Sequence, residues 1–143
     1  MITRTLIAAT LFLPPAGAVV AADPPEKREQ PGEAKKEVPK LSVEDFDARR
    51  KAPDTVVIDV RTPQEFKAGH VPGAVNIDIA DKDFDKKVAA LEKDKTYLVH
   101  CASGRRSAKA VERMRATTKL EKLFDLDGGI QAWQKAGKPV EKE

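Results

Sequence analysis

The sequence predicts an α/β domain built on a parallel β-sheet that has helices packed on both of its faces. Three observations lead to this prediction. Short apolar runs rich in β-branched residues alternate with amphipathic segments of helical period. The run Thr55–Val60 shows no regular alternation of polar and apolar residues, which is typical of a strand covered on both faces. Residues that start or stop helices stand between these runs.

The first elements have recognisable ends. Ser42–Asp45 resembles a capping box, which begins a short helix that runs to about Lys51. The strand Thr55–Val60 follows it. Thr62–Glu65 then begins a second helix, with a threonine cap, a proline at the first helical position and a glutamate that can bond back to the cap. Gly69 ends this helix.

The later elements continue the alternation of strand and helix. In chain order, the pattern predicts a turn at 70–73, a strand at 74–77, a helix from Asp81 to about Lys93, a strand at 96–99, a helix over 108–114, a strand at 123–126 and a helix at 130–136 that Gly137 ends. In such folds ligands bind at the carboxyl ends of the strands. The residues that follow each strand are therefore the candidates for a functional site.

The amino-terminal residues resemble a secretory signal peptide. Arg4 gives a positive start, Leu6–Leu13 is a short apolar segment, and small residues precede a cleavage site after Ala22. Two prolines interrupt the apolar run, which is too short to span a bilayer, so no stable membrane anchor is expected after cleavage. Residues 1–22 are thus predicted to be a signal peptide, and the mature protein is predicted to be periplasmic or secreted.

The composition separates a linker from a domain. Residues 23–40 are rich in proline and charge and contain almost nothing to bury, so they are predicted to be a flexible linker. Residues 41–140 have the size of a single folded domain. The net charge of +3 is spread along the chain without a basic cluster interleaved with aromatic residues, so no nucleic-acid partner is expected.

The only cysteine of the chain, Cys101, lies between a predicted strand and a predicted helix. Backbone N–H groups and the helix dipole favour negative charge at such a junction, and they stabilise a thiolate there. A glycine permits a tight turn, and two arginines suit an oxyanion. We interpret the stretch as a nucleophilic cysteine in an anion-binding loop formed by Ala102, Ser103, Gly104, Arg105, Arg106 and Ser107. The alternative is a buried structural cysteine beside two surface arginines.

Other polar residues near this loop are given supporting roles. Asp59 and Arg61 end a strand near the presumed site, and we expect a scaffold role for them with Arg61 paired to Glu65. His100 adjoins the cysteine, but neighbours along a strand point to opposite faces, so direct catalysis by His100 is not expected. Trp133 is expected to pack in the core.

Three stretches of the chain resemble those of single-domain rhodaneses, a family of persulfide-forming sulfurtransferases. They are Asp59–Ile77, Cys101–Ser107 and Asp127–Trp133. The resemblance implies a rhodanese-like, three-layer domain over residues 41–140, with a central parallel sheet of about five strands. It also implies that His70 lies in a structural turn and is not a catalytic base.

The resemblance implies an activity as well. A sulfane sulfur would move from a donor such as thiosulfate onto Cys101, and the persulfide would pass it to a thiophilic acceptor such as cyanide, a small thiol or a protein thiol. Arg106, with Arg105 beside it, would bind the sulfonate-like end of the donor. No metal or organic cofactor would be needed.

Two alternatives remain open. The chain could be a non-catalytic persulfide carrier or a partner-binding module of the same family. It could also be a phosphatase or arsenate reductase of the related cell-cycle phosphatase type. The phosphatase signature places five residues between cysteine and arginine, whereas Arg106 follows Cys101 after only four. The shorter loop favours a smaller group around sulfur, and so favours sulfur transfer.

Overall fold

The computed structural model describes residues 37–143. The predicted signal peptide and the predicted linker up to residue 36 lie outside the described residues, so both stay predictions. Within residues 37–143, the helices are too short or too polar for any of them to cross a bilayer.

The described residues form one sheet of five parallel strands, which confirms the predicted fold class. Its order is β1-β5-β4-β2-β3, and neighbouring strands pair in parallel throughout. The strands are β1 (Lys40–Leu41), β2 (Thr55–Asp59), β3 (Val75–Asn76), β4 (Thr96–His100) and β5 (Leu123–Leu126). Because all strands run the same way, their carboxyl ends meet at one edge of the sheet, where Asp59 lies in register with His100.

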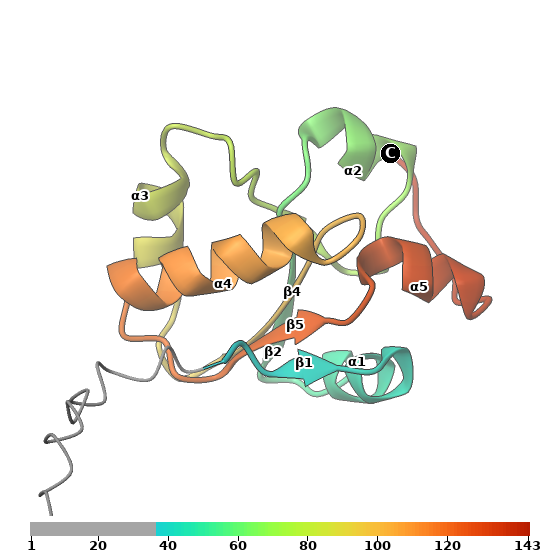
Figure 1. Ribbon diagram of the computed structural model, residues 1–143, viewed down its shortest axis with the longest axis horizontal. Coiled ribbons are helices and arrows are strands. Elements are labelled where there is room, and N and C mark those ends of the chain that lie inside the picture. The colour runs from blue at the N-terminus through green and yellow to red at the C-terminus, as the bar shows by residue number, and fades with distance from the viewer. Residues whose placement is uncertain (1–36) are drawn as a thin grey trace, which may run out of the picture. The chain divides into compact units, whose positions relative to one another are not determined.

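Helices cover both faces of the sheet (Figure 1). They are α1 (Val43–Arg50), α2 (Pro63–Ala68), α3 (Phe84–Ala89), α4 (Arg105–Thr117) and α5 (Gly129–Lys135). One buried apolar cluster packs α3 and α4 against β2, β4 and β5, and a second packs α1 and α5 against the opposite face. The buried strands of the middle of the sheet therefore contribute side chains to both clusters, as their unalternated sequence predicts.

Local signals in the sequence explain where two helices begin. The Ser42 side chain accepts a hydrogen bond from the backbone N–H of Asp45 and caps α1. In α2 the predicted capping box is complete, because Thr62 accepts from the Glu65 backbone and the Glu65 side chain accepts from the Thr62 backbone. Each cap of this kind is worth about 1 kcal/mol. Both predicted helix starts are confirmed, but a complete capping box is present only in α2, while α1 has the Ser42 cap alone.

The helix expected from Asp81 to about Lys93 is shorter in the structure. Its first residues form a turn, in which the Asp81 carboxylate accepts from the Asp83 backbone and the Phe84 N–H reaches back only three residues. At the other end the Leu91 N–H bonds to the carbonyl of Val88, again three residues back. The predicted apolar face is nevertheless present, because Phe84 and Val88 are buried.

The folded region begins earlier than the sequence indicated. Val38 is buried in the first apolar cluster, and Lys40 pairs with Asp125 of β5. The last residues of the predicted linker therefore belong to the folded domain. A two-residue edge strand has no periodicity of its own, so only its pairing with β5 reveals it.

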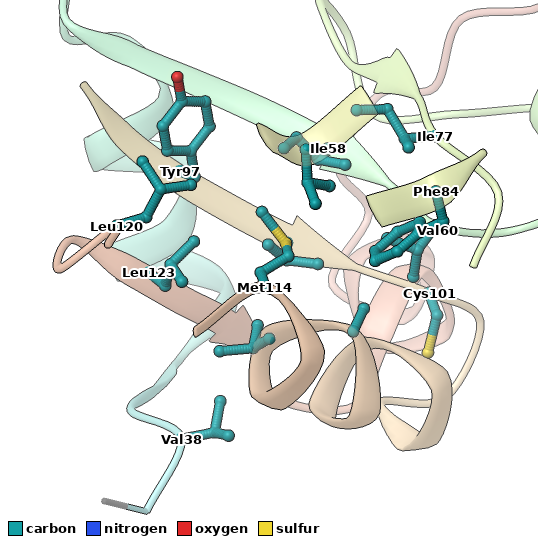
Figure 2. Packing of buried hydrophobic residues seen from close by; sticks show 14 residues of the cluster. Val38, Ile58, Val60, Ile77, Phe84, Tyr97, Cys101, Met114, Leu120 and Leu123 are labelled. Atoms are coloured by element: carbon teal, nitrogen blue, oxygen red, sulfur yellow. The ribbon is translucent and has the colours of Figure 1, made fainter. Parts of the chain in front are cut away.

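The cluster beneath α4 reaches the site of interest. Figure 2 shows Cys101 at one end of this cluster, beside α4, with Val60 and Phe84 near it. The cysteine is therefore continuous with the apolar core on one side, while its polar contacts come from the loop and helix that follow β4.

Candidate active site

The chain leaves β4 and enters α4 through a very short connection. Gly104 is the cap residue of α4, with a φ of 98° that lies in the left-handed region. A residue with a side chain would be strained there, and glycine is not. The helix begins at Arg105, so the last three residues of the predicted loop form its first turn. No side chain caps this end, and the N–H groups of that turn have no partner within the helix.

Cys101 is held by two polar groups. The Gly104 N–H donates to its Sγ at 3.0 Å, and the Ser107 Oγ lies 3.4 Å from the same atom. Only 1% of the residue is exposed. A backbone N–H directed at sulfur and the N-terminal end of a 13-residue helix both stabilise negative charge on it. The structure therefore brings Cys101, Gly104 and Ser107 together at the start of α4.

The connection is fixed from the other side by α5. The N–H groups of Ile130 and Gln131 donate to the carbonyls of Cys101 and Ala102, at 2.8 and 3.1 Å. This approach requires Gly129, because a Cβ there would lie 2.6 Å from each of the two carbonyl oxygens. Gly128 and Gly129 directly precede the predicted helix at 130–136, but the sequence did not predict this contact. Two adjacent glycines indicate a place where another part of the backbone can approach closely. The sequence does not show which part, because the Cys101–Ala102 connection reaches Gly129 only in the tertiary fold.

The two arginines of the loop have different surroundings. Arg106 donates from both terminal nitrogens to both carboxylate oxygens of Glu65, at 2.8 and 2.9 Å. This pair, together with the capping hydrogen bonds from Thr62, lowers the pKa of Glu65 to about 2, and Glu65 in turn raises the pKa of Arg106. Arg105 is exposed, and its side chain has no ion pair with the described residues. The free cation at the loop is thus Arg105.

Arg61 does not pair with Glu65, so that prediction is wrong. Its guanidinium binds both carboxylate oxygens of Asp59, with the closest approach 2.6 Å, and donates to the Gly69 carbonyl at 2.7 Å. Both side chains are almost fully buried. The pair ties the end of β2 to the end of α2, so Asp59 and Arg61 act on the scaffold of the site, without contact to Cys101.

His100 points away from the cysteine, as the strand geometry predicts. Its ring is fully buried and packs edge-on against Phe46, on the sheet face opposite to Cys101. Burial lowers the pKa of His100, although Asp59, whose Oδ2 is 3.7 Å from Nε2, opposes this effect. The ring is therefore neutral at neutral pH and out of reach of the thiol.

Two further residues occupy structural positions. His70 stacks on Phe66 with the ring centroids 3.8 Å apart, and its Nδ1 lies 2.9 Å from the Phe66 carbonyl. Trp133 is fully buried and donates from its indole N–H to the carbonyl of Pro139 at 2.7 Å. His70 thus stabilises the end of α2, and Trp133 belongs to the core, as expected.

The model of the rhodanese-like domain matches residues 42–136. This chain belongs to the rhodanese-like domain family. Among curated proteins it is 35% identical over 95 residues to an HTH-type transcriptional regulator of Mycobacterium tuberculosis, a match that covers 66% of this chain and 41% of the regulator. The chain spans less than half the length of the curated relatives that it matches.

Solved structures agree with this membership. A rhodanese-related protein from Thermoplasma volcanium has 36% identity and a TM-score of 0.65, over 73% of this chain and 99% of that protein. A thiosulfate sulfurtransferase from Pseudomonas aeruginosa has 27% identity and a TM-score of 0.61, over 73% of this chain and 19% of that enzyme. The five-stranded parallel sheet is thus the rhodanese-like fold.

Proposed function

We propose that this rhodanese-like protein is a sulfurtransferase that carries a sulfane sulfur on Cys101. One observation carries the proposal. The Cys101 sulfur accepts the Gly104 N–H at the uncapped amino terminus of α4, and the same turn carries exposed Arg105, which has no ion pair with residues 37–143. An environment of this kind stabilises first a thiolate and then a persulfide anion. The likeness to a thiosulfate sulfurtransferase supports thiosulfate as the donor class.

The reaction has two half-reactions. The Cys101 thiolate attacks the outer sulfur of thiosulfate, a new S–S bond forms, and the old S–S bond breaks so that sulfite leaves with the electron pair. A thiophilic acceptor such as cyanide then attacks the terminal sulfur of the persulfide, and the thiolate is released. The persulfide places its reacting sulfur about 2 Å further from the buried end of β4. This extension favours a small acceptor or the exposed thiol of a partner protein.

We assign different tasks to the two arginines. Arg105, which is exposed and has no partner among the described side chains, would bind the oxygens of thiosulfate and stabilise the departing sulfite. Arg106 is already engaged by both oxygens of Glu65, and it would serve by locking the first turn of α4 onto α2. The donor-binding role that the resemblance gave first to Arg106 therefore moves to its neighbour.

A persulfide carrier with little activity toward small donors is the second candidate. Two observations favour it: Cys101 is 1% exposed, and a curated relative of this domain is a transcriptional regulator. In that role the same persulfide forms, but a specific protein supplies or accepts the sulfur. The two candidates differ in one property: a sulfurtransferase is loaded by thiosulfate itself at a useful rate, and a carrier is not.

The test is mass spectrometry of the reduced protein before and after incubation with thiosulfate. Sulfur transfer predicts an added mass of one sulfur atom on Cys101, and cyanide should remove it and yield thiocyanate. Cys101→Ser should show neither change. A protein that thiosulfate leaves unmodified, but that a protein persulfide loads, would favour the carrier. Absence of loading from both donors would refute sulfur transfer.

A further inference from the structure

Asp125 is a buried carboxyl group that the proposed reaction does not use. It lies in β5, and none of its side chain is exposed. Neither of its carboxylate oxygens has a regular hydrogen bond with the described residues. A charged group in such a place is costly, and a group that the fold leaves unsatisfied calls for an explanation.

The side chain of Asp125 lies on the same face of the sheet as Cys101. It pairs in register with Val99 of β4, whose side chain packs beneath α4 in the same cluster as Cys101. Residues directly opposite in neighbouring strands share a face of the sheet, so the Asp125 side chain also lies under α4. The first turn of α4 places Ser107 there, fully buried, with its Oγ 3.4 Å from the Cys101 sulfur. Ser107 thus lies beside the thiol, and its hydroxyl also acts on the Asp125 carboxyl group.

The charge of Asp125 responds to pH near neutrality. Burial raises the pKa of Asp125 to about 6. Three groups lower the pKa of Asp125 and so counteract part of this rise: the Ser107 hydroxyl, Lys40 of β1 and the Leu126 N–H. The nearby charge of Asp127 raises the pKa further. Cys101 also contributes to the raised pKa of Arg106, so the sulfur and this guanidinium interact electrostatically.

We propose that Asp125 is a positioning residue for Cys101 that acts through the hydroxyl of Ser107. The serine carries one hydroxyl proton and can donate it to only one of its two neighbours. An ionised Asp125 draws that proton, and Ser107 then presents lone pairs to the sulfur, which favours the thiol. A protonated Asp125 donates to Ser107, whose own proton is then free for the thiolate.

The proton balance closes within these three groups. When Cys101 ionises, its S–H bond breaks and the proton passes to the Ser107 oxygen. Ser107 releases its own proton to a carboxylate oxygen of Asp125. The three groups carry one negative charge before and after the transfer, so the buried site gains no second charge. In this relay Cys101 and Asp125 therefore share one proton.

The experiment measures the rate of iodoacetamide alkylation of reduced Cys101 against pH, because the thiolate is the reacting form. The proposal rests on the role of Cys101 as a nucleophile, but alkylation needs no sulfur donor, so it tests the relay separately from sulfur transfer. Asp125→Asn removes a charge without a regular partner and keeps the shape, so the variant is expected to fold. The alkylation midpoint should fall by about one pH unit, since a like charge next to the thiolate has been removed.

Ser107→Ala supplies the decisive background. When Ser107 is alanine, Asp125→Asn should shift the pH midpoint of Cys101 alkylation by less than half of the shift that it causes in the wild type. The reason is that the hydroxyl that links Asp125 to Cys101 is gone. An equal effect in both backgrounds, or no effect in the wild type, would overturn the proposal. Asp127→Asn is the matched control: it removes an exposed carboxylate of the same chain segment and should shift the midpoint far less.

A second measurement does not depend on the asparagine variant. The ¹³C resonance of the Asp125 carboxyl group reports its titration directly, in the wild type and in Cys101→Ala. Linkage is reciprocal, so removing the thiol should move the Asp125 midpoint by an amount comparable to the effect of Asp125 on Cys101. The change should shrink when Ser107 is alanine. An Asp125 titration that is indifferent to the thiol would count against the relay.

Discussion

Arg106 and Glu65 are 41 positions apart in sequence and form a two-bonded ion pair between α4 and α2. Glu65 simultaneously completes the capping box of α2 with Thr62. One carboxylate therefore begins one helix and anchors the first turn of another. Since that turn carries the groups around Cys101, the pair links the stability of α2 to the geometry of the candidate site.

The first prediction concerns acid stability. Glu65→Gln keeps an acceptor for the Thr62 N–H and removes the charge that Arg106 binds. The pKa of Glu65 is lowered to about 2 in the folded protein, so its stabilising effect is complete above its ordinary pKa and is lost as the pH falls toward 2. The half-exposed pair is worth about 1 kcal/mol at most. The melting-temperature gap between wild type and variant should be present at pH 7 and close between about pH 4.5 and 2.

Glu92→Gln is the control for this measurement, since Glu92 forms an exposed pair with Lys95 only three residues away. We expect it to change stability by less than about 0.5 kcal/mol. A Glu65→Gln protein that melts like the wild type at pH 7 would show that the pair between α2 and α4 contributes nothing.

The second prediction separates the two arginines. Arg105→Ala should slow persulfide formation from thiosulfate while leaving discharge to cyanide nearly unchanged, because only the donor has oxygens to bind. Arg106→Lys keeps the charge but loses the paired hydrogen bonds to Glu65, so it should lower the melting temperature and slow both half-reactions. Rapid-mixing measurements of each half-reaction give the comparison. A selective donor defect in Arg106→Lys, with Arg105→Ala normal, would reverse the assignment.

The third prediction concerns the close contact beneath the cysteine. Gly129→Ala places a Cβ against the carbonyls of Cys101 and Ala102 at a φ of +60°, so either the loop or α5 must move. We expect a loss of about 2–4 kcal/mol in unfolding free energy and a strong loss of sulfur transfer. Gly137→Ala is the control, because its φ is also positive but nothing lies within 4 Å of the added atom. It should cost only about 1 kcal/mol and keep activity.

The fourth prediction comes from the sequence alone. Amino-terminal sequencing of the exported protein should find Asp23 or a close neighbour as the first residue, because the pattern before it favours cleavage after Ala22. An intact Met1 in a cytoplasmic fraction would contradict the prediction.

Much of the fold could be predicted from the sequence because its signals are local. The unalternated strand Thr55–Val60, the cap at Thr62 and the glycine after Cys101 each act within a few residues. The length of α3 was overestimated for the same reason. The apolar spacing of Phe84 and Val88 indicated a helix, but the side chains that turn the chain on either side are weak local signals.

The rest depends on contacts between distant segments. Nothing near Arg106 in the sequence identifies Glu65 as its partner, and the wrong pairing of Glu65 with Arg61 came from their closeness along the chain. Asp125 likewise is a single charged residue in a short apolar run, and nothing near it in the sequence marks it as buried beside the site. Only the packing of α4 over β5 shows that it is buried near Ser107.

The last prediction tests the whole reaction. If Cys101 carries sulfur, the first product leaves before the second substrate reacts, so steady-state kinetics with thiosulfate and cyanide should be ping-pong. Wild-type protein that is treated with thiosulfate and then desalted should yield about one thiocyanate per active cysteine when cyanide is added. Cys101→Ser is nearly isosteric and can keep the contacts to Gly104 and Ser107, so it should fold as the wild type does. It should nevertheless be inactive, because a hydroxyl is a far weaker nucleophile than a thiolate and the chain has no other cysteine. Wild-type turnover by this variant would disprove the role of Cys101, and intersecting kinetics without a loaded intermediate would disprove the carrier step.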